Sequence, residues 1–147
     1  MPGISNHFDT ISAIKSIIDG LSLPGLTGGT VIQEVATYHD GTVPLPFVSL
    51  SPYGPEQLGD ELNDRDGAYY GVLVAIIAKP SVNNLETRLG WRQTLRRNLN
   101  NRSLNQLGQN YKLTVEPGNT IEPEAWFDRN AFVSSLIVRA YFQEPRT

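Results

Sequence analysis

The residues YYGVLVAIIAK, positions 69–79, form the longest apolar run in the chain, and Pro80 closes it. The run predicts a buried strand from Ala68 to Lys79. From Gly71 to Ala78 no polar residue falls on either side of the pleat, which indicates a strand covered on both faces. We expect the chain's own helices to cover one face. For the other face the sequence leaves two possibilities open, a neighbouring subunit or the same chain.

The flanking sequence predicts two helices and several shorter strands. Apolar residues at three- and four-residue steps predict a helix from Asn6 to Gly20 or Leu21, capped by Ser5 or Asn6. A second helix is expected from Asn83 or Asn84 to Asn100. The remaining strands are expected at 30–38, 47–51, 111–116 and 131–143, and a long loop is expected at 54–67.

This order of elements, α-β-β-β-α-β-β, predicts an α+β fold in a single domain that spans residues 1–147. We expect a mostly antiparallel sheet of four to five strands, with both helices packed on one face. Prolines 46 and 52 bracket the strand 47–51, which favours a position near a sheet edge.

Composition narrows the possible functions. The chain has no cysteine, which excludes disulfides and thiolate metal sites. Its net charge of −3 argues against a global basic field for nucleic acid. The first ten residues lack the pattern of a signal peptide, and the longest apolar run is far shorter than the roughly 20 residues that cross a bilayer. We therefore expect a soluble protein made in the cytoplasm, with no membrane partner.

Two segments carry opposite charge. Residues 54–67 have a local charge of −4, and residues 84–102 have a local charge of +4. The acids of the first segment, which has Arg65 as its single base, are Glu56, Asp60, Glu61, Asp64 and Asp66. The bases of the second segment, which has Glu86 as its single acid, are Arg88, Arg92, Arg96, Arg97 and Arg102.

Three of these arginines, Arg88, Arg92 and Arg96, share the face of the predicted helix that carries its leucines. A desolvated arginine without a partner is costly. We therefore predict that they lie at a subunit contact, where the acidic segment of an adjacent copy arrives. The alternative is that the arginines bend around the helix edge and pair within the chain.

Motifs for chemistry are weak. Asp64-x-Asp66-Gly67 resembles the middle of a calcium-binding EF-hand loop, but Leu62 and Leu73 stand where the first acid and the closing glutamate are required. His39-Asp40 lacks any accompanying nucleophile or metal motif. We expect no catalytic residue, no metal and no cofactor. An enzyme built on Asp60, Glu61 and Asp64 is kept as an alternative, which needs a concave pocket and perturbed pKa values.

With LPFVSLSP at 45–52, an arginine-bearing helix and RNAFVSSLIVRAYFQEPR at 129–146, the chain resembles the tail-terminator and head-to-tail joining proteins of tailed bacteriophages. The resemblance implies a ring, usually a hexamer, at the head-proximal end of the tail. Such a ring ends tail-tube polymerisation and presents a surface to the neck proteins, and DNA passes through its lumen without specific binding. It implies no active-site residue.

The partners implied are therefore further copies of the chain, the tail tube protein and the neck or connector proteins. Asp60, Glu61, Asp64 and Asp66 are placed at the lumen or a subunit contact by the charge argument. Alternatives are another neck or minor tail component, such as a stopper or adaptor, and a small cellular binding domain.

Overall fold

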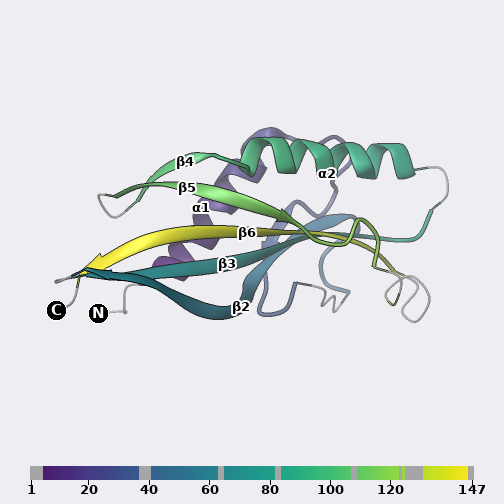
Figure 1. Ribbon diagram of the computed structural model, residues 1–147. Helices are drawn as coiled ribbons and strands as arrows, with labels where there is room; N and C mark the ends of the chain where they lie inside the picture. The colour runs from purple at the N-terminus through teal and green to yellow at the C-terminus, as the bar shows by residue number, and fades with distance from the viewer. Residues whose placement is uncertain are drawn as a thin grey trace.

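The computed structural model describes residues 5–36, 41–62, 65–81, 84–106, 109–122, 124 and 131–145 (Figure 1). Its elements in chain order are α1 (Asn6–Leu21), β1 (Thr30–Ile32), β2 (Phe47–Leu62), β3 (Arg65–Ala78), α2 (Leu85–Leu99), β4 (Ser103–Gln106), β5 (Gln109–Pro117) and β6 (Phe132–Pro145). Both predicted helices form within one or two residues of the expected bounds. Ser5 caps α1, because its side chain accepts a hydrogen bond from the backbone N–H of Phe8.

The strands form one six-stranded sheet in the order β1-β2-β3-β6-β5-β4. The last strand, β6, lies between β3 and β5, and it pairs with β3 from Arg65↔Pro145 to Ala78↔Phe132. The expectation of four to five strands was wrong because it missed β4, whose sequence SLNQ carries almost no apolar signal. The sheet is mixed, since β1 runs parallel to β2 whereas every other pairing is antiparallel.

Both helices pack on the same face of the sheet, as the sequence predicts (Figure 1). Ile14 and Ile18 of α1 and Leu95 of α2 are almost fully buried there. Alternate residues of the long strands complete this core: Val72, Val74 and Ile76 of β3, and Leu136, Val138 and Ala140 of β6. Trp91 belongs to the same cluster and donates from Nε1 to the carbonyl oxygen of Pro24 at 3.0 Å, which ties α2 to the segment after α1.

On the opposite face, the chain covers one half of β3 by itself. Ala75 and Ile77 are buried in a second cluster with Ala36, Phe47 and Val133. For this half the chain's own residues, not a neighbouring subunit, supply the cover. Towards the other end of β3 the cover thins, because Leu73 is only partly buried and Tyr69 is 39% exposed.

The loop expected at 54–67 was wrong. Strand β2 continues to Leu62, and β3 begins at Arg65, so the two strands form a long hairpin. Register shifts between Tyr53 and Gln57 and between Leu58 and Glu61 accommodate the irregular sequence. Among the described residues β1 pairs with β2 only at Val48–Leu50, so Pro52 and Pro55 fall where the outer edge of β2 has no strand partner.

The strand expected at 30–38 was too long, since it ends at Ile32 and residues 33–36 are not in a strand. Positions 37 and 38 lie outside the described residues. No helix in the described part of the chain is long and apolar enough to cross a membrane.

Candidate assembly surfaces

Arg92 is fully engaged within the chain. From the middle of α2 its guanidinium reaches the turn after β5 and the start of β6. Its acceptors are the carbonyl oxygens of Gly118 (3.1 Å), Asn119 (3.1 Å) and Ser135 (2.6 Å) and the hydroxyl of Ser134 (2.9 Å). Burial, with the neighbouring charge of Arg96, lowers the pKa of Arg92 below its ordinary value. The within-chain alternative therefore describes Arg92, although its acceptors are neutral groups and not acids.

Arg88 is the least exposed of the three arginines, at 6%. Its guanidinium carbon lies 5.0 Å from the centre of the Phe132 ring, a cation–π contact. Its Nη1 is buried and has no hydrogen-bond partner within the described part of the chain. Burial lowers the pKa of this guanidinium. An unsatisfied donor of this kind costs about 1–3 kcal/mol, so Arg88 is present at a cost to the isolated chain.

Arg96 is exposed near the C-terminal end of α2, where it and Arg97 complement the helix dipole. The described residues form two ion pairs, Lys15–Asp19 and Arg139–Glu116, and neither includes an arginine of α2. Thus the three arginines share a helix but have three different environments. Their joint assignment to a subunit contact stays a prediction.

The acids of the predicted contact lie on the hairpin. Glu56, Asp60 and Glu61 belong to β2 and Asp66 belongs to β3, whereas Asp64 lies outside the described residues. Figure 1 shows that the hairpin end of β2 and β3 lies at one end of the molecule, and that α2 begins at the other end. The negative and positive segments are therefore separated along the long axis of the fold.

A polar cluster that the sequence did not reveal fixes the start of α1 to the hairpin end of the sheet. The Glu144 carboxylate accepts hydrogen bonds from Asn6 Nδ2 and from the Tyr70 hydroxyl, both at 2.5 Å. His7 Nε2 lies 2.7 Å from the carbonyl oxygen of Gly71. Asn6 and Glu144 are 138 positions apart, and no local spacing signals such a pair. Glu144, one residue beyond the strand predicted at 131–143, belongs to β6.

The uncovered half of the sheet carries a shallow hollow of about 350 Å³ between β2, β3, β6 and the turn after β5. Beside it, Arg139 pairs with Glu116 at 2.9 Å and lies over the Tyr53 ring at 5.8 Å. No group of three or more metal-ligating side chains occurs among the described residues. Side chains of Asp60 and Glu61 are not described, so the enzyme alternative built on them stays untested.

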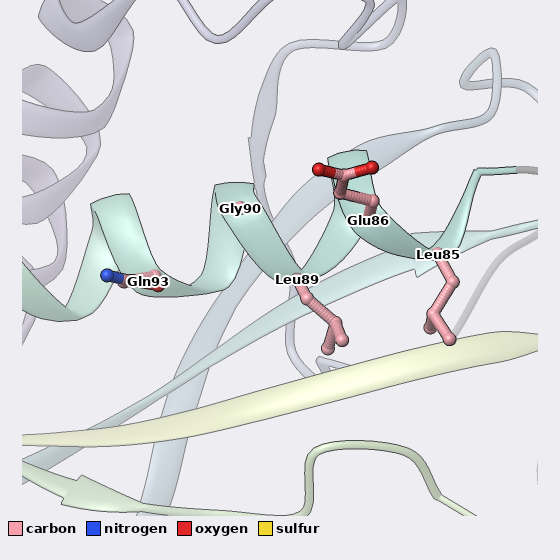
Figure 2. A pocket seen from close by; sticks show the side chains of 5 residues that line it. All are labelled: Leu85, Glu86, Leu89, Gly90 and Gln93. Carbon is pink, nitrogen blue, oxygen red and sulfur yellow. The ribbon is translucent and has the colours of Figure 1, made fainter.

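A second hollow, an open groove of about 570 Å³, lies beside the first half of α2. Its described lining comes from α2 alone: Leu85, Glu86, Leu89, Gly90 and Gln93. Figure 2 shows Leu85 and Leu89 projecting to one side of the helix and Glu86 projecting to the other. Leu85 is 42% exposed, so the groove presents an apolar surface to solvent.

One of three comparisons with known proteins found a similar fold. No protein-family model and no curated protein matches the sequence. Among solved structures, the chain is similar to one from the "Virion of native gene transfer agent (GTA) particle", with a TM-score of 0.60 and 17% identity over 90% of this chain and 93% of that chain. The chain shares its fold with a virion component. At this identity the likeness concerns the fold alone.

Proposed function

We propose that this protein is a non-enzymatic structural component of a phage-like virion. The observation that carries the proposal is the shared fold with a chain of a gene transfer agent virion, which extends over nine-tenths of both chains. Coverage of nearly the whole length of both chains means that the likeness concerns the fold as a whole and not a single motif. We further propose that the protein is made in the host cytoplasm before it enters the particle.

Within that class, we propose the role of tail terminator. In this role copies close into a ring, usually a hexamer, at the head-proximal end of the tail, where they end tube polymerisation and join the neck. Support comes from the predicted order of helices and strands, which the structure has with one further strand, β4, and with a hairpin in place of the expected loop. The tail tube protein lies on one side of the ring and the neck proteins on the other, and DNA passes through the lumen without specific binding.

The ring requires a contact between unlike surfaces. We propose that Asp60, Glu61, Asp64 and Asp66 of one copy face the basic side of α2 of the next, where Arg96 is exposed. We propose that Arg88 and Arg92 support the same contact from inside the subunit. Arg92 holds α2 against the β5–β6 turn, and Arg88 has a buried donor without a partner among the described residues.

The proposed role of tail terminator is tested by inactivating the gene that encodes this chain and examining the particles that form. Loss of a terminator gives tubes longer than normal that carry no head, because nothing ends their growth. Loss of a stopper or adaptor, the second candidate, gives tails of normal length that remain separate from heads. Particles of normal form and yield would contradict both candidates. Electron microscopy of lysates, with the gene supplied on a plasmid as control, distinguishes these outcomes.

A further inference from the structure

We propose that the outer edge of β2 is a guarded edge, which prevents copies of the chain from joining sheet to sheet. The guarded edge is the side of β2 that faces away from β3, at residues 51–58. The inference concerns the sheet of a single chain and does not depend on the proposed ring. It identifies a surface that is closed to a second copy, so that copies associate through other surfaces.

The sheet described here has two edges, and their strands differ in length. At one edge lies β4, with four residues. At the other edge, β1 pairs with β2 only from Val48 to Leu50, and β2 continues to Leu62. A very short edge strand offers few backbone groups, whereas a long one is a template on which another chain can pair. The outer side of β2 is therefore the edge that requires protection.

Backbone hydrogen bonds show where pairing along this edge would continue. The N–H of Val48 donates to the carbonyl oxygen of Gly29 at 2.9 Å, and the carbonyl oxygen of Leu50 accepts from the N–H of Gln33 at 2.8 Å. Alternate residues of a strand direct their backbone groups to the same side. The next outward donor would be the N–H of residue 52. That residue is Pro52, which has no N–H and whose ring is exposed to solvent.

Beyond Pro52 the backbone departs from a regular extended strand. Gly54 has a φ of 66°, a left-handed conformation that interrupts an extended ladder. Pro55 follows and removes a second backbone donor. The register with β3 shifts between Tyr53 and Gln57. Proline and irregular pairing are both features by which natural sheets prevent edge-to-edge association.

Exposed apolar side chains on the same hairpin explain why this edge requires protection. Leu58 of β2 is 75% exposed, and Tyr69 of β3 is 39% exposed. An open edge beside exposed apolar side chains promotes aggregation, because an added strand gains backbone hydrogen bonds and apolar contact together. The side chains stay exposed in this chain, so the protection comes from the backbone of β2.

Substitution of Pro52 tests the guarded edge. Pro52→Thr restores the outward N–H and introduces a residue with high strand propensity. Pro52→Lys restores the same N–H but places a charge at the edge, which itself opposes strand addition. Pro44→Thr controls for the loss of a proline, because Pro44 is exposed and lies outside the strands. Sedimentation velocity at increasing protein concentration measures association, and circular dichroism verifies that each variant is folded.

We expect Pro52→Thr to associate at a protein concentration about tenfold lower than the wild type, since a restored backbone hydrogen bond and its strand contacts favour pairing. Pro52→Lys and Pro44→Thr should sediment as the wild type does. A folded Pro52→Thr chain that sediments as the wild type at every concentration would overturn the guarded edge. Equal association of all three variants would overturn it too, because the effect would then belong to substitution in general.

Hydrogen exchange of the wild-type chain gives a second test, which does not require any variant to fold. The backbone amides within residues 51–58 should exchange equally fast at low and high protein concentration. Slower exchange in this segment at high concentration would show that a second copy pairs there and would overturn the proposal. The virion role is judged separately, by the presence of the chain in purified particles, so the two failures are distinguishable.

Discussion

The Nη1 atom of Arg92 donates to the carbonyl oxygen of Ser135 at 2.6 Å and thereby joins the middle of α2 to strand β6, 43 positions later. The same guanidinium holds the carbonyl oxygens of Gly118 and Asn119, so one side chain organises the turn that leads from β5. A planar group with five donors is suited to this task, and a lysine ammonium is not.

Replacing Arg92 should therefore destabilise the chain. We expect Arg92→Ala to lower the free energy of unfolding by roughly 2 kcal/mol, since hydrogen bonds from a charged donor contribute about 1.5–3 kcal/mol when desolvated and less when partly solvated. Arg92→Lys should recover less than half of the loss. Urea titration measures both, with exposed Arg97→Ala as the control at under about 0.5 kcal/mol. Equal effects at positions 92 and 97 would contradict the role of Arg92.

Replacing Arg88 should have the opposite effect and raise the free energy of unfolding. Its buried Nη1 has no acceptor among the described residues, at a cost of about 1–3 kcal/mol, and its contact with Phe132 returns about 0.5–2 kcal/mol. Arg88→Met removes the buried donors and the charge and leaves a shorter, apolar and polarisable side chain at this position. We expect the free energy of unfolding to rise by about 1 kcal/mol, measured by thermal and urea unfolding. A loss of stability, compared with Arg102→Met on the surface, would show that the charge is needed within the chain.

Glu144 should control the order of the start of α1. Oε2 of Glu144 accepts from both Asn6 and Tyr70, and Glu144→Gln removes the negative charge from this acceptor, so both hydrogen bonds become weaker. We expect a loss of about 1 kcal/mol, with faster hydrogen exchange in the first turn of α1. Glu116→Gln is the matched control, because the Glu116 side chain is 52% exposed in its pair with Arg139 and such a pair contributes under about 1 kcal/mol. Unchanged exchange in Glu144→Gln would refute this anchoring.

Replacing either of two glycines with alanine should change the stability of the chain, in opposite directions at the two positions. A Cβ at Gly28 would lie 2.1 Å from the carbonyl oxygen of Pro44 and 2.7 Å from Cβ of Phe47, so the segment that covers the second face must move. We expect Gly28→Ala to cost about 1–3 kcal/mol. Gly20, inside α1, has open space around it, and Gly20→Ala should stabilise the chain by up to about 1 kcal/mol. Calorimetry checks both signs.

In the proposed ring, substitution of two neighbouring arginines should have different effects. Arg96 and Arg97 are both exposed, but they face different sides of α2, and only Arg96 shares the side of the leucines. We expect Arg96→Glu to raise the dissociation constant of the assembled ring about tenfold or more, and Arg97→Glu to change it little. Sedimentation at low and high salt measures this difference. Equal weakening by both variants would indicate a diffuse charge effect and would contradict a specific contact.

The sequence predicted the elements whose signals are local. The apolar run at 69–79 placed the central strand, and the three- and four-residue steps of Ile11, Ile14 and Ile18 placed α1, where all three are buried. Phe8, on the same predicted face, is 54% exposed. The helical periodicity that includes Phe8 was predicted correctly. Its burial, however, depends on how far the sheet extends beneath the first turn of α1, which the local sequence does not determine.

The sequence-based predictions failed where strand pairing overrides the local conformational preference of the residues. The segment GPEQLGDELNDRDG has the composition of a loop, but its residues in β2 pair with β3, and its residues in β3 also pair with β6 from the far end of the chain. The same distinction between local sequence and tertiary contacts applies to the arginines of α2. The helical face of Arg88, Arg92 and Arg96 was visible in the sequence, but the carbonyl acceptors of Arg92 were not, because they are fixed by the fold of a turn.

The position of β6 has a consequence for biosynthesis. Strand β3 lies between β2, which is synthesised just before it, and β6, which is synthesised last. Until residues 132–145 have left the ribosome, one edge of the central strand has no partner, and the carboxylate that holds the start of α1 does not exist. A chain that lacks β6 therefore leaves one whole edge of β3 open to solvent and the start of α1 without its anchor, so the central sheet forms only when its two most distant segments meet.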